Sequence, residues 1–197
     1  MTALLAERRA DVKPIQLKQI VSIESFLSHY ANRQNRFKYE WNNGIIEKTP
    51  RTMNRDQTLI QWRLIRLFAT TAAFKNDCGL IVELDMFIKI ENRTRRADIG
   101  FLNAEQMTAS EKGDLSVSSF IIEIVSKNDK GYAIGKKLNE YFKSGAQVVW
   151  EIYPTLKKVE VYTSLRDVKI CMGDDICSAA PVLPDFNISA NAVFGDA

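Results

Sequence analysis

Two acidic residues stand inside otherwise apolar, strand-like segments of the chain. Asp98 lies in the segment ADIGFL, and Glu123 lies in the segment SFIIEIVS. A carboxylate among apolar neighbours is costly unless it faces solvent, pairs with a cation or binds a metal ion. Side chains alternate along a strand, so Glu123 shares its face with Ile121 and Val125, which favours a sheltered site. The alternative is that both acids are ordinary polar positions on a half-exposed sheet.

A lysine follows the second acidic segment in a position suited to phosphoryl chemistry. Lys137 lies at the margin of an apolar stripe that recurs with helical spacing through Leu138 and Tyr141. From there its ammonium group can lean over the strand ends toward the two carboxylates. Its charge would then orient an attacking water or stabilise a phosphorane-like transition state. The alternative is a solvated helix lysine beside Lys136 and Lys143.

The composition excludes several other kinds of catalytic and metal-binding site. The chain has a single histidine, His29, and three cysteines without a CxxC pair, Cys78, Cys171 and Cys177. It therefore has almost no material for a zinc site or for Ser-His-Asp or Cys-His catalysis. We expect the cysteines to be reduced thiols in or near a core. An enzyme built from this chain must use carboxylates, lysines and hydroxyls, which favour hard, oxygen-ligated metals such as Mg²⁺.

The bulk composition is that of a soluble globular protein. Hydrophobic residues make up 46% and charged residues 26% of the 197 residues, and the formal net charge is +3. No apolar run is long enough to span a bilayer, and the first residues do not resemble a signal peptide, so we expect a cytoplasmic protein without membrane association. We expect a flexible arm over residues 1–15 and a single domain over residues 16–197.

The hydrophobic patterning predicts a mixed α/β fold. A tight turn at Asn42-Asn43-Gly44 predicts a hairpin, with Glu40 near the end of its first strand. Apolar residues at helical spacing predict one long helix after the hairpin. The acidic segment from Cys171 to Asp175 is interpreted as a turn. The predicted helices cover residues 22–32, 54–75 and 131–144, and the further strands cover residues 80–90, 97–102, 119–126, 147–154 and 157–163, with a closing tail at 182–189.

The ordered set of motifs resembles a known family. From Tyr39 to Val161 the chain resembles the Uma family of restriction-endonuclease-like proteins, a group of the PD-(D/E)XK nuclease superfamily long catalogued as a domain of unknown function. Each motif is short, but their order along the chain is fairly specific. The matching segments are Tyr39-Glu40 before a hairpin and a strand ending in Pro50, then RRADIGF, IIEIVS with Glu123 and Ser126 in register, KKLNEYFKSGAQVVWEI with Lys137, Tyr141, Gly145 and Trp150, and finally VLPDFNIS.

This resemblance implies a restriction-endonuclease-like mixed β-sheet flanked by helices, with a metal-dependent nuclease site. Asp98 and Glu123 would be metal ligands, with the backbone carbonyl of Ile124 as a third. Lys137 would supply the lysine that classical members carry two residues after the Glu, and Glu40 would be an auxiliary acid. The implied metal is Mg²⁺, with Mn²⁺ as a substitute.

Two departures from the family pattern bear on activity. Ala97 replaces the usual proline before the Asp, a position that shapes the backbone rather than the chemistry. The family often has a histidine early in its long helix, and this chain offers Asp56 or its neighbours there. If that histidine matters to the members that have it, full activity of this chain is in question.

Basic residues near these segments suggest a nucleic-acid surface. Arg55 and Arg66 fall with Trp62 on the helix face opposite the apolar stripe, and Arg93, Arg95 and Arg96 are expected to crowd a turn just before Asp98. Lys127 and Lys130 follow the Glu123 strand. Cations beside both acidic strands suit a polyanionic substrate, because phosphate contacts provide most nonspecific affinity. Ordinary surface decoration is the alternative, and Trp62 can equally pack against a second subunit.

The hypothesis that combines these features is a Mg²⁺-dependent endonuclease acting on DNA, as a homodimer because cutting both strands is simplest with two sites. A second hypothesis is a DNA-binding or assembly module that keeps the nuclease fold without hydrolysing anything. A third is an unrelated α/β domain with structural acids, which would be favoured if Asp98 and Glu123 pointed to opposite sides of the sheet.

Overall fold

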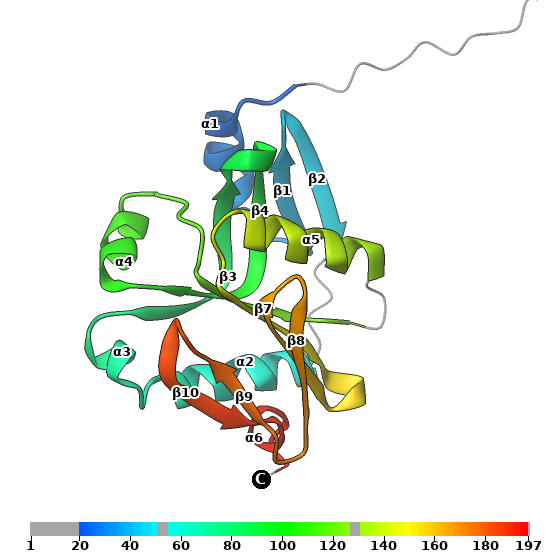
Figure 1. Ribbon diagram of the computed structural model, residues 1–197. Helices are drawn as coiled ribbons and strands as arrows, with labels where there is room; N and C mark the ends of the chain where they lie inside the picture. The colour runs from blue at the N-terminus through cyan, green and yellow to red at the C-terminus, as the bar shows by residue number, and fades with distance from the viewer. Residues whose placement is uncertain (1–19, 51–54, 127–130, 197) are drawn as a thin grey trace, which may run out of the picture.

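The chain folds into a large mixed sheet with helices on both faces and a smaller sheet near the C-terminus (Figure 1). The structure is a computed structural model that describes residues 20–50, 55–126 and 131–196. The expected arm over residues 1–15 lies outside the described residues. Across the described ranges no helix is long and apolar enough to pass through a membrane. The mixed α/β class expected from the sequence is confirmed.

Strands and helices alternate along most of the chain. The strands are β1 (Phe37–Asn42), β2 (Ile45–Pro50), β3 (Gly79–Ile88), β4 (Arg93–Leu102), β5 (Phe120–Ile124), β6 (Val148–Tyr153), β7 (Lys158–Ser164), β8 (Asp167–Met172), β9 (Ile176–Ala179) and β10 (Leu183–Ser189). The helices are α1 (Ile23–Phe26), which continues into a π-helical turn (Leu27–Ala31), then α2 (Arg55–Phe68), α3 (Ala72–Lys75), α4 (Ala104–Glu111), α5 (Gly131–Lys143) and α6 (Ala190–Phe194).

The large sheet follows the order β2-β1-β4-β5-β6-β7-β8, and β3 pairs with the other edge of β4. Its strand pairs are antiparallel except for β5 and β6, which run parallel. A parallel pair needs a crossover connection, and α5 lies in that connection. The hairpin between β1 and β2 turns at Asn43 and Gly44, which both have positive φ angles, as the Asn-Gly pair predicts.

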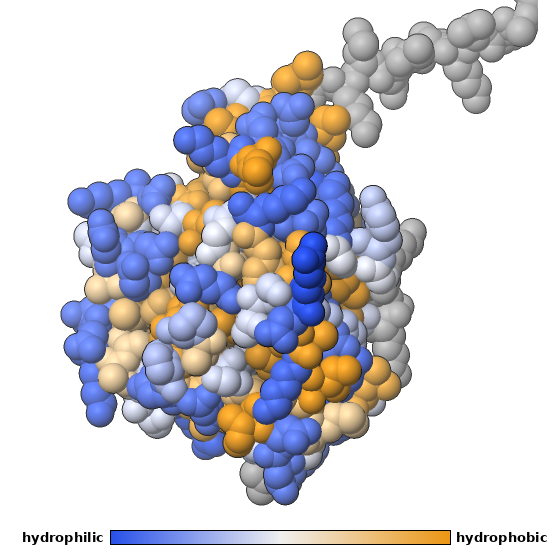
Figure 2. Space-filling view, viewed as in Figure 1, coloured by the Kyte–Doolittle hydropathy of each residue, from blue (hydrophilic) through white to orange (hydrophobic). Residues whose placement is uncertain are grey.

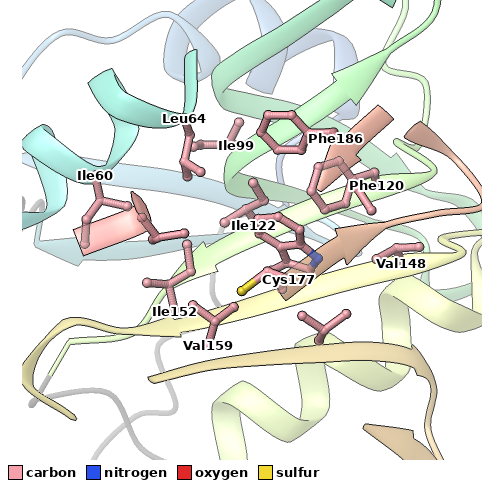
Figure 3. Packing of buried hydrophobic residues seen from close by; sticks show 14 of the residues in the cluster. Ile60, Leu64, Ile99, Phe120, Ile122, Val148, Ile152, Val159, Cys177 and Phe186 are labelled. Atoms are coloured by element: carbon pink, nitrogen blue, oxygen red, sulfur yellow. The ribbon is translucent and has the colours of Figure 1, made fainter. Parts of the chain in front are cut away.

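Two apolar cores lie on opposite faces of this sheet. On one face, Ile60 and Leu64 of α2 pack on Ile122 of β5, together with residues of β6, β7, β9, β10 and α6 (Figure 3). On the other face, Leu138 and Tyr141 of α5 pack with residues of β3, β5 and β6. A third, smaller cluster joins α1 to β1. The alternation within β5 thus places Ile122 under α2 and Glu123 on the α5 side.

The long helix expected over residues 54–75 is divided in the structure. Helix α2 ends at Phe68, and α3 begins at Ala72. The hydroxyl of Thr71 accepts the backbone N–H of Phe74, and the carboxylate of Asp185 accepts the N–H of Ala72. These two acceptors pair with N–H groups at the start of α3. The helix therefore breaks between Phe68 and Ala72, although the apolar spacing in the sequence continues across the break.

The region after β7 is more regular than the sequence indicated. Cys171 and Met172, expected in a turn, form the end of strand β8, and the expected turn is confined to residues 173–175 before β9. The expected tail forms β10, which pairs with β9. Short strands with mixed polarity carry a weak alternation signal, which is why the pattern did not reveal β8 and β9.

Candidate active site

The large sheet opens along one edge of β4. Among the described residues, that edge pairs with β1 at Arg93 and Asn42, and with β5 at Ile99 and Gly100. Between these contacts no described strand lies beside the backbone of β4, although buried backbone polar groups must be paired. Two carboxylates fill the gap: Glu40 accepts the N–H of Arg96 over 3.0 Å, and Asp98 accepts the N–H of Ile124 over 2.8 Å.

The strand also rotates at this opening. In a regular strand, residues two apart share a face, yet Ala97 belongs to the core under α5 and Ile99 to the core under α2. Glu83 on β3 lies opposite Asp98, has a φ of +52° and makes no ladder pair with it. Positive φ is uncommon for a residue other than glycine. This local distortion turns Asp98 toward the α5 side, where Glu123 also points.

Asp98 is held by two donors from different strands. Its Oδ2 accepts the Ile124 N–H from β5, and its Oδ1 accepts the ammonium of Lys38 from β1 over 2.7 Å. Only 15% of the Asp98 side chain and 22% of the Lys38 side chain are exposed. The carboxylate is therefore fixed in orientation and paired with a cation at the edge of a pocket.

Two side chains of α5 contact Glu123. The ammonium of Lys137 lies 3.0 Å from its Oε2, and the hydroxyl of Tyr141 donates to its Oε1 over 2.5 Å. Burial raises the pKa of Glu123, and the nearby charge of Asp98 adds to this increase, while Lys137 opposes it. Burial alone would lower the pKa of Lys137, but the carboxylates of Glu123, Glu40 and Asp98 raise it above its usual value. Lys137 is thus a permanent cation at neutral pH.

A buried ion-pair network holds Glu40 in position. Its Oε2 lies 2.7 Å from Arg95, whose Nε donates to Glu140 of α5 over 2.6 Å. Burial raises the pKa of Glu40, but Lys137 and Arg95 outweigh burial and hold that pKa below its usual value. Glu140 is 1% exposed and also lies 3.6 Å from Arg93. The network therefore keeps Glu40 ionised and immobile.

An acidic row continues across the neighbouring strands. Glu123 is in register with Glu151 on β6, and Glu151 is in register with Glu160 on β7. Each of the three carboxylates accepts a tyrosine hydroxyl, from Tyr141, Tyr153 and Tyr162 respectively. Burial raises the pKa of Glu151. The row extends the negative potential of the site along the α5 face of the sheet.

These side chains line one pocket of about 540 Å³. Asp98, Glu123, Glu40 and Lys137 all contribute to its wall, so the two acids lie on the same side of the sheet. Apolar residues of β5 and α5 form part of the wall, and Tyr132 is 86% exposed at the rim. A pocket of this size is typical for a small ligand or one unit of a polymer.

The donor set fits a hard divalent cation. The expected ligands are the carboxylates of Asp98 and Glu123 and the backbone carbonyl of Ile124. All three supply oxygen atoms, which are the ligands that Mg²⁺ and Mn²⁺ prefer. The Ile124 carbonyl accepts the amide of Gln57 over 3.1 Å, which leaves its second lone pair available. Among the described residues no three His, Cys, Asp or Glu side chains form a metal cluster.

The basic residues expected to contact nucleic acid are exposed on α2 but buried on β4. Arg55 and Arg66 are exposed on α2, and Arg66 stacks on Trp62 with 4.9 Å to the ring centroid. The turn expected at Arg93–Arg96 is wrong, because these residues form the start of β4. Lys127 and Lys130 lie outside the described residues.

Arg95 and Arg96 are buried rather than presented on the surface. Arg95 pairs with Glu40 and Glu140, and Arg96 turns to the opposite side of the sheet, where it pairs with Asp85 over 2.5 Å and donates to the carbonyl of Ala31. Both guanidinium groups are therefore paired inside the fold, Arg95 beside the site and Arg96 on the other face, which corrects the expectation of an open phosphate-binding surface. Alternation separates them onto different faces, because consecutive residues of a strand point in opposite directions.

Several residues of the site were missed by the sequence analysis. Lys38 stands two residues before Glu40, and period-2 alternation alone would have placed both side chains on one face. Gln57 lies three residues before the buried Ile60 and is itself buried near the start of α2. Glu140 had no signal that distinguishes it from a solvated helix residue, since its partners come from β4.

Comparison with known proteins identifies the family of the chain. The family model Uma2, described as "Putative restriction endonuclease", matches residues 23–191. The chain belongs to the Uma2 family. The family model spans all the residues of the site, from Lys38 on β1 to Tyr141 on α5. None of the curated proteins matches the chain.

A solved structure shares the fold. The crystal structure of a "putative nuclease belonging to DUF820" from Anabaena variabilis superposes with a TM-score of 0.72 and 17% sequence identity, over 89% of this chain and 98% of that chain. A cryo-EM structure of a DrdV–DNA complex matches 58% of this chain and 12% of that chain, at 14% identity and a TM-score of 0.32, which is too low to support an argument.

Proposed function

We propose that this Uma2-family protein is a divalent-metal-dependent endonuclease that hydrolyses phosphodiester bonds of DNA. The observation that carries the proposal is the meeting of Asp98, Glu123 and Lys137 in one pocket. These residues come from β4, β5 and α5, and Lys137 lies 3.0 Å from Glu123. Two fixed carboxylates and a permanent cation beside them are the groups that metal-assisted phosphoryl hydrolysis requires.

The metal ion, Mg²⁺ with Mn²⁺ as a substitute, would supply a Lewis acid and a more acidic bound water when it is held by Asp98, Glu123 and the Ile124 carbonyl. Tyr141 holds one oxygen of Glu123, and the Ile124 N–H holds one oxygen of Asp98, so both ligands are preoriented. Their remaining oxygens are paired with lysine ammonium groups, which a bound metal would displace or share.

The charge of Lys137 has a role of its own in the proposed mechanism. In the metal-free site the carboxylates of Glu123, Glu40 and Asp98 hold the pKa of Lys137 above its usual value, so the side chain is an ammonium group. A protonated lysine can attract the scissile phosphate and stabilise the additional negative charge that develops on its oxygens. Glu40 remains ionised in the same pocket, and its negative charge raises the pKa of Lys137.

Plasmid cleavage tests this proposal. Purified protein with Mg²⁺ or Mn²⁺ should nick supercoiled DNA, and chelation of the metal should stop the reaction. The isosteric variants Asp98→Asn and Glu123→Gln and the variant Lys137→Ala should lose cleavage. Lys143→Ala, which changes an exposed lysine on the same helix, should retain it. Equal cleavage by the wild type and the two carboxylate variants would reject this mechanism.

The same experiment distinguishes the alternative of a nuclease-fold DNA-binding module. That alternative requires salt-sensitive DNA binding, measured by fluorescence anisotropy, with no nicking in either metal. The ion pairs that already neutralise Asp98 and Glu123 are the feature of the site that is compatible with it. Metal-dependent nicking that the carboxylate variants abolish would exclude the alternative.

A further inference from the structure

Gln61 of α2 is a buried polar side chain in the wall of the pocket that holds Asp98 and Glu123. Only 7% of Gln61 is exposed. Its amide makes no hydrogen bond within the described part of the chain, whereas the amide of Gln57, one turn earlier, donates to the Ile124 carbonyl over 3.1 Å. Buried polar groups are normally paired, so this amide indicates a partner that comes from outside the chain.

The amide of Gln61 opens into the pocket rather than into the apolar core. Among the described residues, the fully enclosed side-chain atoms that lack a partner belong to Arg93 and Glu140. The Gln61 amide is not among them, so it is accessible from the pocket that its side chain lines. A side-chain amide carries both a donor and an acceptor. Gln61 therefore offers both to a molecule in the pocket.

The pocket is lined from both faces of the large sheet. Gln57 and Gln61 belong to α2, which packs on one face, and Lys137 and Tyr141 belong to α5, which packs on the other. The opening along the edge of β4 allows one pocket to contact both helices. A ligand that fills the pocket can therefore place one part beside the carboxylates and another part beside α2.

We propose that Gln61 binds the base of an unpaired nucleotide whose phosphate lies at Asp98 and Glu123, so that the substrate is single-stranded or locally unpaired DNA. This rests on the proposed function, which places the scissile phosphodiester at the two carboxylates. The edge of an unpaired base presents a donor and an acceptor that match those of an amide. A phosphate oxygen only accepts, so a phosphate at Gln61 would leave the amide oxygen unpaired.

The size of the pocket and the depth of its polar groups fit a nucleotide that has left the base stack. The volume is about 540 Å³, and the side chains of Asp98 and Glu123 are only 15% and 13% exposed. In a duplex the pairing edge of each base is bonded to the other strand, so a base must leave the stack to reach a buried side chain.

The walls and the surroundings of the pocket suit the two parts of a nucleotide. Pro50, Val125 and Ile134 contribute apolar wall, which can pack on the flat face of a base. Figure 2 shows mostly hydrophilic side chains over the upper part of the molecule, where Figure 1 draws β1 and β2 beside the pocket. A hydrophilic surface there suits the sugar and phosphate groups of a strand that leaves the pocket.

Nucleotides that contain no phosphodiester bond test the base contact without any cleavage. Isothermal titration in Mn²⁺ compares the four 2′-deoxynucleoside 5′-monophosphates, one at a time, with 2-deoxyribose 5-phosphate, which lacks the base. At least one nucleotide should bind the wild type roughly tenfold more tightly than the sugar phosphate. Gln61→Met, close in size but apolar, should remove most of this difference and leave the affinity for the sugar phosphate unchanged.

Gln147→Met is the matched control, because it changes an exposed glutamine outside the pocket and should retain the difference. Circular dichroism and thermal melting of both variants establish that they remain folded. Nucleotides that bind no more tightly than the sugar phosphate, or a Gln61→Met variant that keeps the difference, would overturn the base contact even if the protein cuts DNA. Gln61-dependent nucleotide binding by a protein that cuts no DNA would support the base contact and reject the proposed endonuclease.

Cleavage of end-labelled oligonucleotides tests the substrate class. A single strand, and a duplex that contains a short unpaired bubble, should be cut faster than the same sequence fully paired. Gln61→Met should reduce cleavage of the single strand roughly tenfold. A fully paired duplex cut as fast as the single strand would overturn the proposed substrate class and leave the endonuclease proposal standing.

Discussion

At the residue scale, each of the two central carboxylates meets a lysine that comes from a different element. Lys38 of β1 reaches Asp98, and Lys137 of α5 reaches Glu123. The two pairs are partly shielded from solvent, so their charges interact more strongly than in water. A metal ion bound by both carboxylates would therefore compete with both ammonium groups for the same oxygens.

This competition predicts a separation of metal affinity from cleavage. Lys38→Met should bind Mn²⁺ more tightly, by roughly tenfold, because Asp98 loses its competing cation. The same variant should cleave DNA more slowly, because a group that attracts phosphate is lost. Isothermal titration with Mn²⁺ measures the first effect, and plasmid nicking measures the second. Lys143→Met is the matched control, and unchanged or weaker Mn²⁺ binding by Lys38→Met would contradict the competition.

At the element scale, α5 is joined to β4 by buried charges as well as by apolar packing. Glu140 accepts from Arg95 and lies near Arg93, and Arg95 in turn holds Glu40. Apolar contacts alone would allow α5 to slide along the sheet, whereas a hydrogen-bonded ion pair has one preferred geometry. The helix position determines where Lys137 and Tyr141 meet Glu123, so the ion pairs link the position of the helix to the site.

Removal of Glu140 should therefore be costly. Glu140→Ala leaves two buried guanidinium groups with fewer partners, and we expect a loss of about 3–5 kcal/mol in the free energy of unfolding. Urea unfolding followed by circular dichroism measures this loss. Glu111→Ala, an exposed glutamate at the end of α4, should change stability by no more than about 0.5 kcal/mol. A loss below about 1 kcal/mol for Glu140→Ala would show that the network does not hold the helix.

At the scale of the whole molecule, the small C-terminal sheet closes the core under α2. Cys171 of β8 and Cys177 of β9 lie inside this core, while Cys78, before β3, is half-buried against its edge. Burial raises the pKa of the Cys177 thiol well above its usual range. All three cysteines are free thiols in the structure, which agrees with their expected reduced state.

Thiol accessibility therefore reports on the closure of this core. In the native protein, a thiol-specific chromogenic reagent should modify the half-buried Cys78 first and leave Cys171 and Cys177 unmodified, because a fully buried thiol does not meet the reagent. All three should react in urea. The variant Cys78→Ser should remove the fast phase and serves as the control. Rapid native labelling of that variant would indicate that β9, β10 and α6 do not pack as described.

The sequence by itself determined the elements around the site and the identity of its main residues. Alternation within SFIIEIVS placed Glu123 beside Ile121, and the Asn-Gly turn located the hairpin that carries Glu40. Such local patterns can be recognised in the sequence because each strand or helix has its own periodicity of buried apolar residues. The spacing of Lys137 on the margin of its helix likewise anticipated its position beside Glu123.

Only the tertiary structure decided how these elements meet. The rotation of β4 between Ala97 and Ile99 turns Asp98 toward α5, and no period-2 pattern contains that rotation. The roles of Arg95, Arg96 and Glu140 likewise depend on partners from distant segments, so residues that appear as surface charges in the sequence become buried supports in the fold. The physical reason is that the cost of burying a charge depends on which partners the rest of the chain brings to it.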